Sequence, residues 1–142
     1  DGVLWSKSLK VLIEFKNGNK IQRKDIHLKI LNSLLILCDI NSCSISDLRH
    51  ELIFILVYNE ENNPITSQEI RQYENERNDE VQESTNRDII GRYFCRIAKS
   101  EFVRYDLLKY KGLYFKDVHS YSQYEFDSWM CKRLSNCIFG II

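Results

Sequence analysis

The chain has 142 residues, of which 44% are hydrophobic and 12% aromatic, and it carries no net charge. That length fits one domain, and that composition supplies a core that needs neither a structural metal nor disulfide staples. The sequence has no run of about eighteen apolar residues, which excludes a membrane-spanning helix. We therefore predict a single domain over 1–142 with no metal and no other cofactor, and we expect no membrane partner.

The charge is segregated along the chain. Residues 1–58 carry a net charge of +2, residues 59–86 carry −6, and residues 87–142 carry +4. Each block sets its own local field, because charges are screened beyond a Debye length of about 8 Å. This pattern predicts a hairpin with two helices in 1–58, an acidic flexible loop over 59–86, and a helical half in 87–142.

Residue usage also indicates the setting of the protein. The five cysteines are an odd number, and three of them lie in patterns typical of helix interiors, where a thiol behaves as a small hydrophobic group. This favours a reducing compartment, the cytoplasm or the nucleus. Seventeen Ile and eleven Asn against a single Ala are typical of an AT-rich coding genome, such as that of a virus, a parasite or an endosymbiont. The chain begins with Asp, which is typical of a fragment or a processed product.

The N-terminal part predicts a β-hairpin followed by two helices. Residues 9–15 alternate apolar and polar side chains, and the Asn-Gly-Asn sequence at 17–19 is a strong hairpin signal. From Asp25, a candidate N-cap, apolar residues recur every three or four positions, and the resulting helix is expected to be central and buried. A second helix with a serine cap is expected to include residues 52–58, although the periodicity of that apolar run leaves a strand open.

The remainder predicts helices on either side of a break. The acidic segment is a long exposed loop with one loose helix near residues 68–76, and helical spacing continues through residues 86–111. Gly112 interrupts the pattern, and Ser122 with Glu125 forms a capping box that begins a last helix. The predicted fold class is α+β and predominantly α-helical, with an N-terminal β-hairpin packed on about four helices and a long acidic loop between the halves.

Catalytic motifs are missing from the sequence. Its Cys and His residues lack the spacings of metal ligands, and its glycines form neither a phosphate-binding loop nor the turn around a nucleophile. Asp47, His50 and Glu51 share one side of the predicted second helix, but such a set is most often a solvated helix face. The sequence therefore predicts a protein that is not an enzyme.

Aromatic residues and an apolar C-terminal tail favour a role in protein binding. Trp and other large apolar residues are the types that anchor protein interfaces. We expect a small accessory protein, of viral or similar origin, that binds a partner protein such as a host protein and forms a homo-oligomer. The predicted interface residues are Trp5, Trp129, Phe139, Ile141 and Ile142.

Basic residues interleaved with aromatic ones indicate an alternative function. Lys and Arg side chains bind phosphates, while aromatic rings stack on unpaired bases. The alternative is therefore an RNA-binding or single-stranded nucleic-acid-binding protein that uses a basic helix. The predicted binding residues are Arg87, Arg92, Arg96, Lys99 and Arg104.

Overall fold

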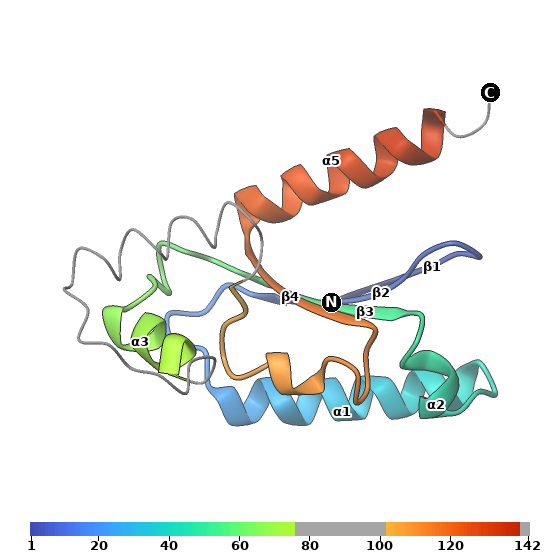
Figure 1. Ribbon diagram of the computed structural model, residues 1–142, viewed down its shortest axis with the longest axis horizontal. Coiled ribbons are helices and arrows are strands. Elements are labelled where there is room, and N and C mark those ends of the chain that lie inside the picture. The colour runs from blue at the N-terminus through green and yellow to red at the C-terminus, as the bar shows by residue number, and fades with distance from the viewer. Residues whose placement is uncertain (76–101, 140–142) are drawn as a thin grey trace.

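A computed structural model of the chain describes residues 1–75 and 102–139 (Figure 1). Its centre is a four-stranded sheet in the order β1-β2-β3-β4. The strands are β1 Gly2–Trp5, β2 Lys10–Lys16, β3 Leu52–Tyr58 and β4 Asp117–Ser122. β1 is antiparallel to β2, whereas β2, β3 and β4 are parallel to one another.

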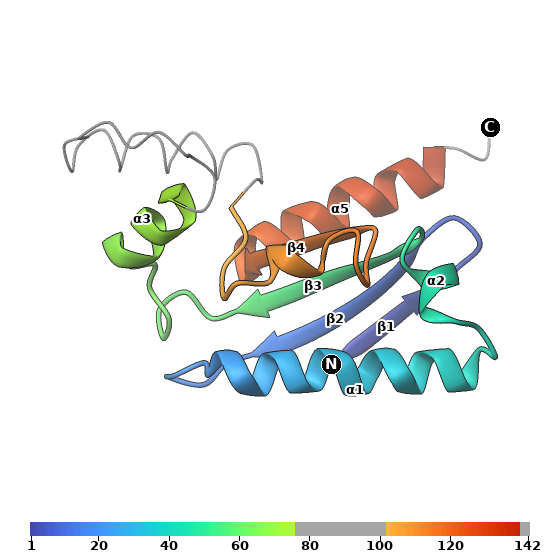
Figure 2. The same cartoon turned by 60° about the horizontal axis from the view of Figure 1, so that its bottom comes forward.

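Helices cover both faces of this sheet (Figures 1 and 2). The helices α1 Arg23–Ile40 and α2 Ile45–Leu48 lie on one face, together with the 3₁₀ helix η1 Leu108–Tyr110. Helix α5 Gln123–Phe139 lies on the opposite face, and α3 Ser67–Asn75 follows the end of β3. Within the described part of the chain, no helix is both long and apolar enough to cross a bilayer.

The strand β3 forms the middle of the core. All seven of its residues are buried, because α1 covers one face of the sheet and α5 covers the other. Leu52, Phe54 and Leu56 belong to the cluster on the α1 side, while Ile53 and Ile55 belong to the cluster on the α5 side. A continuous apolar run is the usual signature of a strand buried on both faces of a parallel sheet.

The predicted fold class is wrong, because the protein has a mixed four-stranded α/β sheet instead of a hairpin packed on helices. Residues 52–58 form a strand, and this strand pairs with β2 in parallel over its whole length. The turn signal at 17–19 leads into α1, and the antiparallel partner of β2 is β1, which precedes it in the chain. Turn residues and apolar periodicity are local signals, whereas the choice of strand partner depends on contacts far apart in the sequence.

Two predicted helix boundaries are also wrong. Helix α1 begins at Arg23 after Gln22, without a side-chain cap, so Asp25 lies in its first turn. The helix predicted over 86–111 does not extend through its described residues, since Tyr105 and Asp106 adopt left-handed backbone angles with φ of 61° and 58°. The earlier residues of that prediction lie outside the described part of the chain.

The prediction for the start of α5 is confirmed. The Ser122 N–H donates to Glu125 Oε2 over 2.7 Å, and the Glu125 N–H donates to Ser122 Oγ over 3.4 Å. This reciprocal pair satisfies two backbone donors at the start of the helix. The loose helix predicted near residues 68–76 is present as α3.

Candidate functional site

Strand β1 forms one edge of the sheet, and no described strand pairs with its outer side. The Ser6 N–H donates to the Leu9 carbonyl over 2.9 Å and closes the turn between β1 and β2. Hydrogen-bonded and non-hydrogen-bonded pairs alternate along an antiparallel ladder. Gly2 and Leu4 are therefore bonded to β2, and the backbone N–H and C=O groups of Val3 and Trp5 point toward the edge.

The side chains of Val3 and Trp5 are exposed on the α1 side of the sheet. Val3 stands opposite Leu12, and Trp5 stands opposite Lys10. Leu12 belongs to the core cluster beneath α1, which identifies the face on which Val3 and Trp5 lie. Their exposed fractions are 50% and 38%, so this edge offers both unpaired backbone groups and apolar side chains.

An ion-pair cluster shows which side of α1 faces β1. The Lys29 ammonium group contacts Asp1 and also lies 2.7 Å from Oε1 of the buried Glu14. Lys16 Nζ approaches the same Glu14 oxygen at 3.0 Å. Glu14 is thus neutralised by two lysines, and Lys29 connects α1 to β2 and to Asp1, the residue directly before β1.

Ile36 and Ile40 continue the side of α1 that carries Lys29. They follow Lys29 by seven and eleven residues, which places them along one stripe of a helix, and their exposed fractions are 58% and 72%. β1 and α1 run in the same direction (Figure 2). From Lys29 to Ile36 the helix rises about 10 Å, while the extended chain covers about 13 Å from Asp1, the residue that Lys29 contacts, to Trp5.

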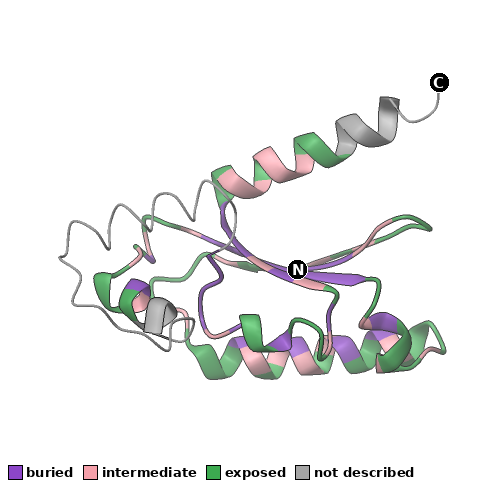
Figure 3. Cartoon of the chain, in the orientation of Figure 1, coloured by how far each residue is buried: buried purple, intermediate pink, exposed green. Residues whose placement is uncertain are grey.

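Measured along the common direction of α1 and β1, Ile36 and Ile40 therefore lie at about the same distance as Trp5. They stand on the side of α1 that faces β1. We call Val3, Trp5, Ile36 and Ile40 the β1–α1 surface. Figure 3 shows that the buried residues of α1 lie on the side that faces the sheet, whereas the side away from the sheet is exposed. Ile36 and Ile40 are exposed although they belong to the apolar last turns of α1, so the expectation of a central, buried helix is wrong for this side.

A second feature is a cleft of about 390 Å³ at the carboxyl ends of β2 and β3. The Phe15 and Phe126 rings meet edge to face there, with centroids 5.7 Å apart. The Asn59 amide donates to Asn17 Oδ1 over 2.7 Å, so these two polar groups bond to each other. The lining residues are Phe15, Lys16, Asn17, Val57, Tyr58, Asn59, Gln123, Phe126 and Asp127.

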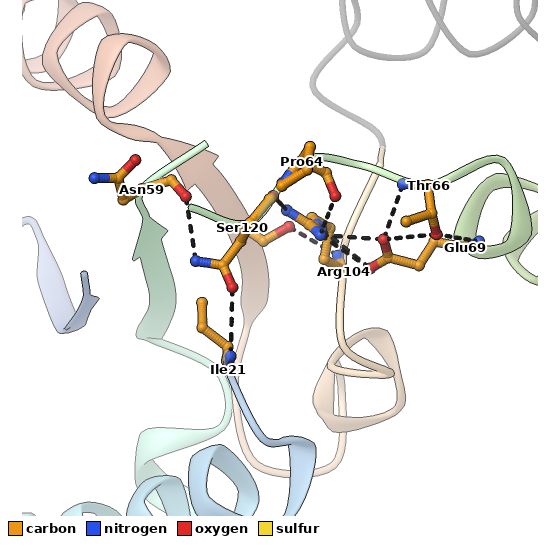
Figure 4. Close-up of polar contacts among 8 residues, drawn as sticks. Ile21, Asn59, Pro64, Thr66, Glu69, Arg104 and Ser120 are labelled. Atoms are coloured by element: carbon orange, nitrogen blue, oxygen red, sulfur yellow. Dashed lines mark hydrogen bonds and ion pairs between the residues drawn. The ribbon is translucent and has the colours of Figure 1, made fainter. Parts of the chain in front are cut away.

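Arg104, one of the predicted nucleic-acid-binding residues, lies inside the fold (Figure 4). Its Nε and Nη2 atoms donate to Glu69 Oε1 over 3.2 and 3.1 Å, and Nη1 donates to the Asn63 carbonyl over 2.7 Å. The guanidinium carbon lies 4.5 Å from the Tyr58 ring centroid and 4.7 Å from that of Tyr105. This guanidinium group is hydrogen-bonded within the chain and is not exposed to solvent, where it could bind a phosphate group.

The electrostatic setting keeps Arg104 charged. Burial alone would lower the pKa of the guanidinium group, but neighbouring Tyr105 and the Glu69 carboxylate outweigh it and raise this pKa above its ordinary value. Glu69 also accepts the Thr66 N–H over 3.1 Å at the start of α3. The acidic segment thus contributes a carboxylate that both begins a helix and holds a buried arginine.

The other predicted site residues lie in different places. Trp129 is half-buried in α5, where its ring stacks on Phe126 at a centroid distance of 6.2 Å. Phe139 is the last residue of α5. The predicted residues outside the described part of the chain are Arg87, Arg92, Arg96, Lys99, Ile141 and Ile142.

Sequence reasoning named Trp5 but missed Val3, Ile36 and Ile40. The available signal was the end of α1, which is apolar almost all round and which a single sheet cannot cover on every side. When a helix packs on one layer only and has apolar residues on more than one side, a row of apolar side chains stays exposed. Such a row is typical of a binding surface.

Comparison of the chain with protein-family models, with curated proteins and with solved structures gave no match. Across residues 1–75 and 102–139, no three His, Cys, Asp or Glu side chains gather as a metal site requires. The function must therefore be inferred from the geometry of the chain itself.

The burial of His119 on β4 is expected to make the stability of the fold depend on pH. Burial lowers its pKa below the ordinary value of 6.5, although the Asp117 carboxylate, 3.6 Å away, opposes the shift. Burial also lowers the pKa of His27. Because the unfolded chain binds these protons more tightly than the folded chain, the free energy of unfolding is expected to fall as the pH drops below 6.5.

Urea unfolding on either side of that pH measures the effect. His119→Gln is expected to lose part of the pH dependence, and the double variant with His27→Gln to lose more. Equal pH dependence in the wild type and the double variant would contradict this assignment.

Proposed function

We propose that this protein is a non-enzymatic interaction module whose β1–α1 surface binds an extended segment of a partner protein. The observation that carries the proposal is a strand edge that no strand of residues 1–75 and 102–139 pairs with, beside four exposed apolar side chains. Edge strands accept additional strands through main-chain hydrogen bonds. Apolar patches on soluble proteins are typical of binding surfaces.

The geometry indicates the kind of segment that fits. The outward N–H and C=O groups of Val3 and Trp5 supply the hydrogen bonds of an added strand. Side chains alternate between the two faces of a strand, so every second residue of the added segment would face Ile36 and Ile40. The preferred partner segment is therefore extended, with apolar residues at alternate positions.

The proposal includes a reducing compartment, either the cytoplasm or the nucleus. Cys38 and Cys43 are thiols without a disulfide bond. Burial raises the pKa of the Cys38 thiol above its ordinary value, which keeps it protonated and slow to oxidise. These properties support a thiol that serves packing at the end of α1.

Selection from a phage library of random peptides tests the proposed surface. Peptides with alternating apolar residues are expected to be enriched on the wild-type chain and to lose binding to the double variant Ile36→Lys, Ile40→Lys. Leu113→Lys is the matched control, because Leu113 is also exposed, at 49%, but lies on the loop before β4.

The control variant is expected to retain the selected peptides. The proposal fails if no alternating sequence is enriched, or if the enriched peptides bind the double variant as tightly as the wild type. Circular dichroism of each variant verifies that it is folded.

A further inference from the structure

We infer that the partner of the β1–α1 surface is a second copy of this chain, whose β1 pairs with this β1 in an antiparallel arrangement. The inference rests on the proposed function, because it names the partner of that same surface. Two four-stranded sheets would join into one continuous sheet across a two-fold axis. Both copies use the same strand in this contact, so the pairing is isologous and the assembly closes as a dimer.

The hydrogen-bonding pattern limits the register of the two strands. Val3 and Trp5 carry the outward backbone groups, so they must form the hydrogen-bonded pairs between the copies. Under two-fold symmetry, two registers pair Val3 with an outward-pointing residue inside β1 of the second copy. Either Leu4 lies on the axis and Val3 faces Trp5 of the second copy, or Val3 lies on the axis and faces itself.

Charge complementarity selects the first register. With Leu4 on the axis, Asp1 of each copy stands opposite Lys7 of the other, which pairs opposite charges at both ends of the joined strands. With Val3 on the axis, Asp1 stands opposite Trp5, and Lys7 extends past the end of the other strand. The first register also pairs Val3 with Trp5, and aromatic with β-branched pairs stabilise antiparallel strands.

The same two-fold axis accounts for the exposed side of α1. An axis perpendicular to the sheet keeps α1 of both copies on one face. Val3 and Trp5 of the two copies then form a shared apolar floor, and Ile36 and Ile40 of each copy flank it. One operation therefore supplies partners for the strand edge and covers the exposed apolar side chains.

Sedimentation of the full chain over a wide range of concentrations tests the strand pairing. The wild type is expected to dimerise, whereas Val3→Pro is expected to remain a folded monomer. Proline removes an N–H that points outward, and it leaves the bonds between β1 and β2 in place. Val3→Thr keeps both the N–H and the β-branched shape, and it is expected to dimerise.

A charge-exchange pair tests the register. Lys7→Glu alone and Asp1→Lys alone each place like charges opposite one another at both ends, and each is expected to weaken dimerisation about tenfold. A mixture of the two variants pairs opposite charges at both ends, so it is expected to form the mixed dimer in preference to either homodimer. Preferential mixed dimers also show that both variants are folded.

Each other outcome overturns part or all of the inference. If the single variants dimerise as tightly as the wild type, or the mixture shows no preference, the register is wrong. If the wild type stays monomeric, or Val3→Pro folds and still dimerises, the pairing through β1 is wrong. If the wild type is monomeric but enriches alternating peptides, the dimer is wrong and the proposed function stands. If the wild type neither dimerises nor enriches such peptides, both the dimer and the proposed function are wrong.

Discussion

Arg104→Ala is expected to lower the free energy of unfolding by about 3–5 kcal/mol, the usual cost of removing one partner of a buried ion pair. Only 4% of Arg104 is exposed, and its guanidinium group bonds Glu69 and the Asn63 carbonyl. The substitution would leave the Glu69 carboxylate without its cation and remove the group that packs against Tyr58 and Tyr105. Urea unfolding monitored by circular dichroism measures the loss.

Lys109→Ala is the matched control for this substitution. Lys109 belongs to the same segment and pairs with Asp106 at 2.6 Å, but its side chain is 49% exposed. Exposed ion pairs contribute at most about 1 kcal/mol. Arg104→Lys keeps the charge without the forked donor geometry and is expected to fall between the two. Equal losses for Arg104→Ala and Lys109→Ala would contradict a structural role for the buried arginine.

Phe115→Ala is expected to cost about 3–5 kcal/mol of unfolding free energy, the range for removing a large ring from a packed core. Phe115 is completely buried and lies 5.4 Å from Phe54, measured between ring centroids. The Gly112 N–H donates to the Phe115 carbonyl over 2.7 Å, which holds the ring's backbone in place. The substitution would leave a cavity in place of the ring. It would remove the contact between the segment before β4 and Phe54 on the central strand β3.

Leu113→Ala serves as the control in the same loop. Its side chain is 49% exposed, and exposed substitutions usually change stability by about 0.5 kcal/mol or less. The same urea titration compares the two variants. A loss below about 1 kcal/mol for Phe115→Ala would mean that the loop does not close this side of the core.

Local signals in the sequence predicted some of the individual elements correctly. The capping box at Ser122 and Glu125 was predicted correctly because both of its hydrogen bonds span only three residues. Alternation in residues 9–15 identified β2 for a similar reason, since successive side chains of a strand point to opposite faces of the sheet. The apolar run at 52–58 was ambiguous, because a strand covered on both faces loses the alternation that marks a half-buried strand.

The candidate surface was only partly predictable from the sequence. Trp5 was named from its residue type, but the sequence contains no local signal that β1 is an edge strand. Ile36 looked like a core residue, because helical periodicity does not show how many layers cover a helix. Arg104 looked like a ligand for phosphate, yet its partner Glu69 lies 35 residues away in the acidic segment.

The sequence by itself determined where several elements begin and end, because caps, breaks and periodicity act over three to seven residues. It also determined that the end of α1 carries apolar side chains on more sides than one sheet can cover. Only the tertiary structure decided which of these side chains stay exposed and which charges become internal. Strand order and the Arg104–Glu69 pair depend on contacts between distant segments, and these contacts leave β1 at the edge beside the uncovered side of α1.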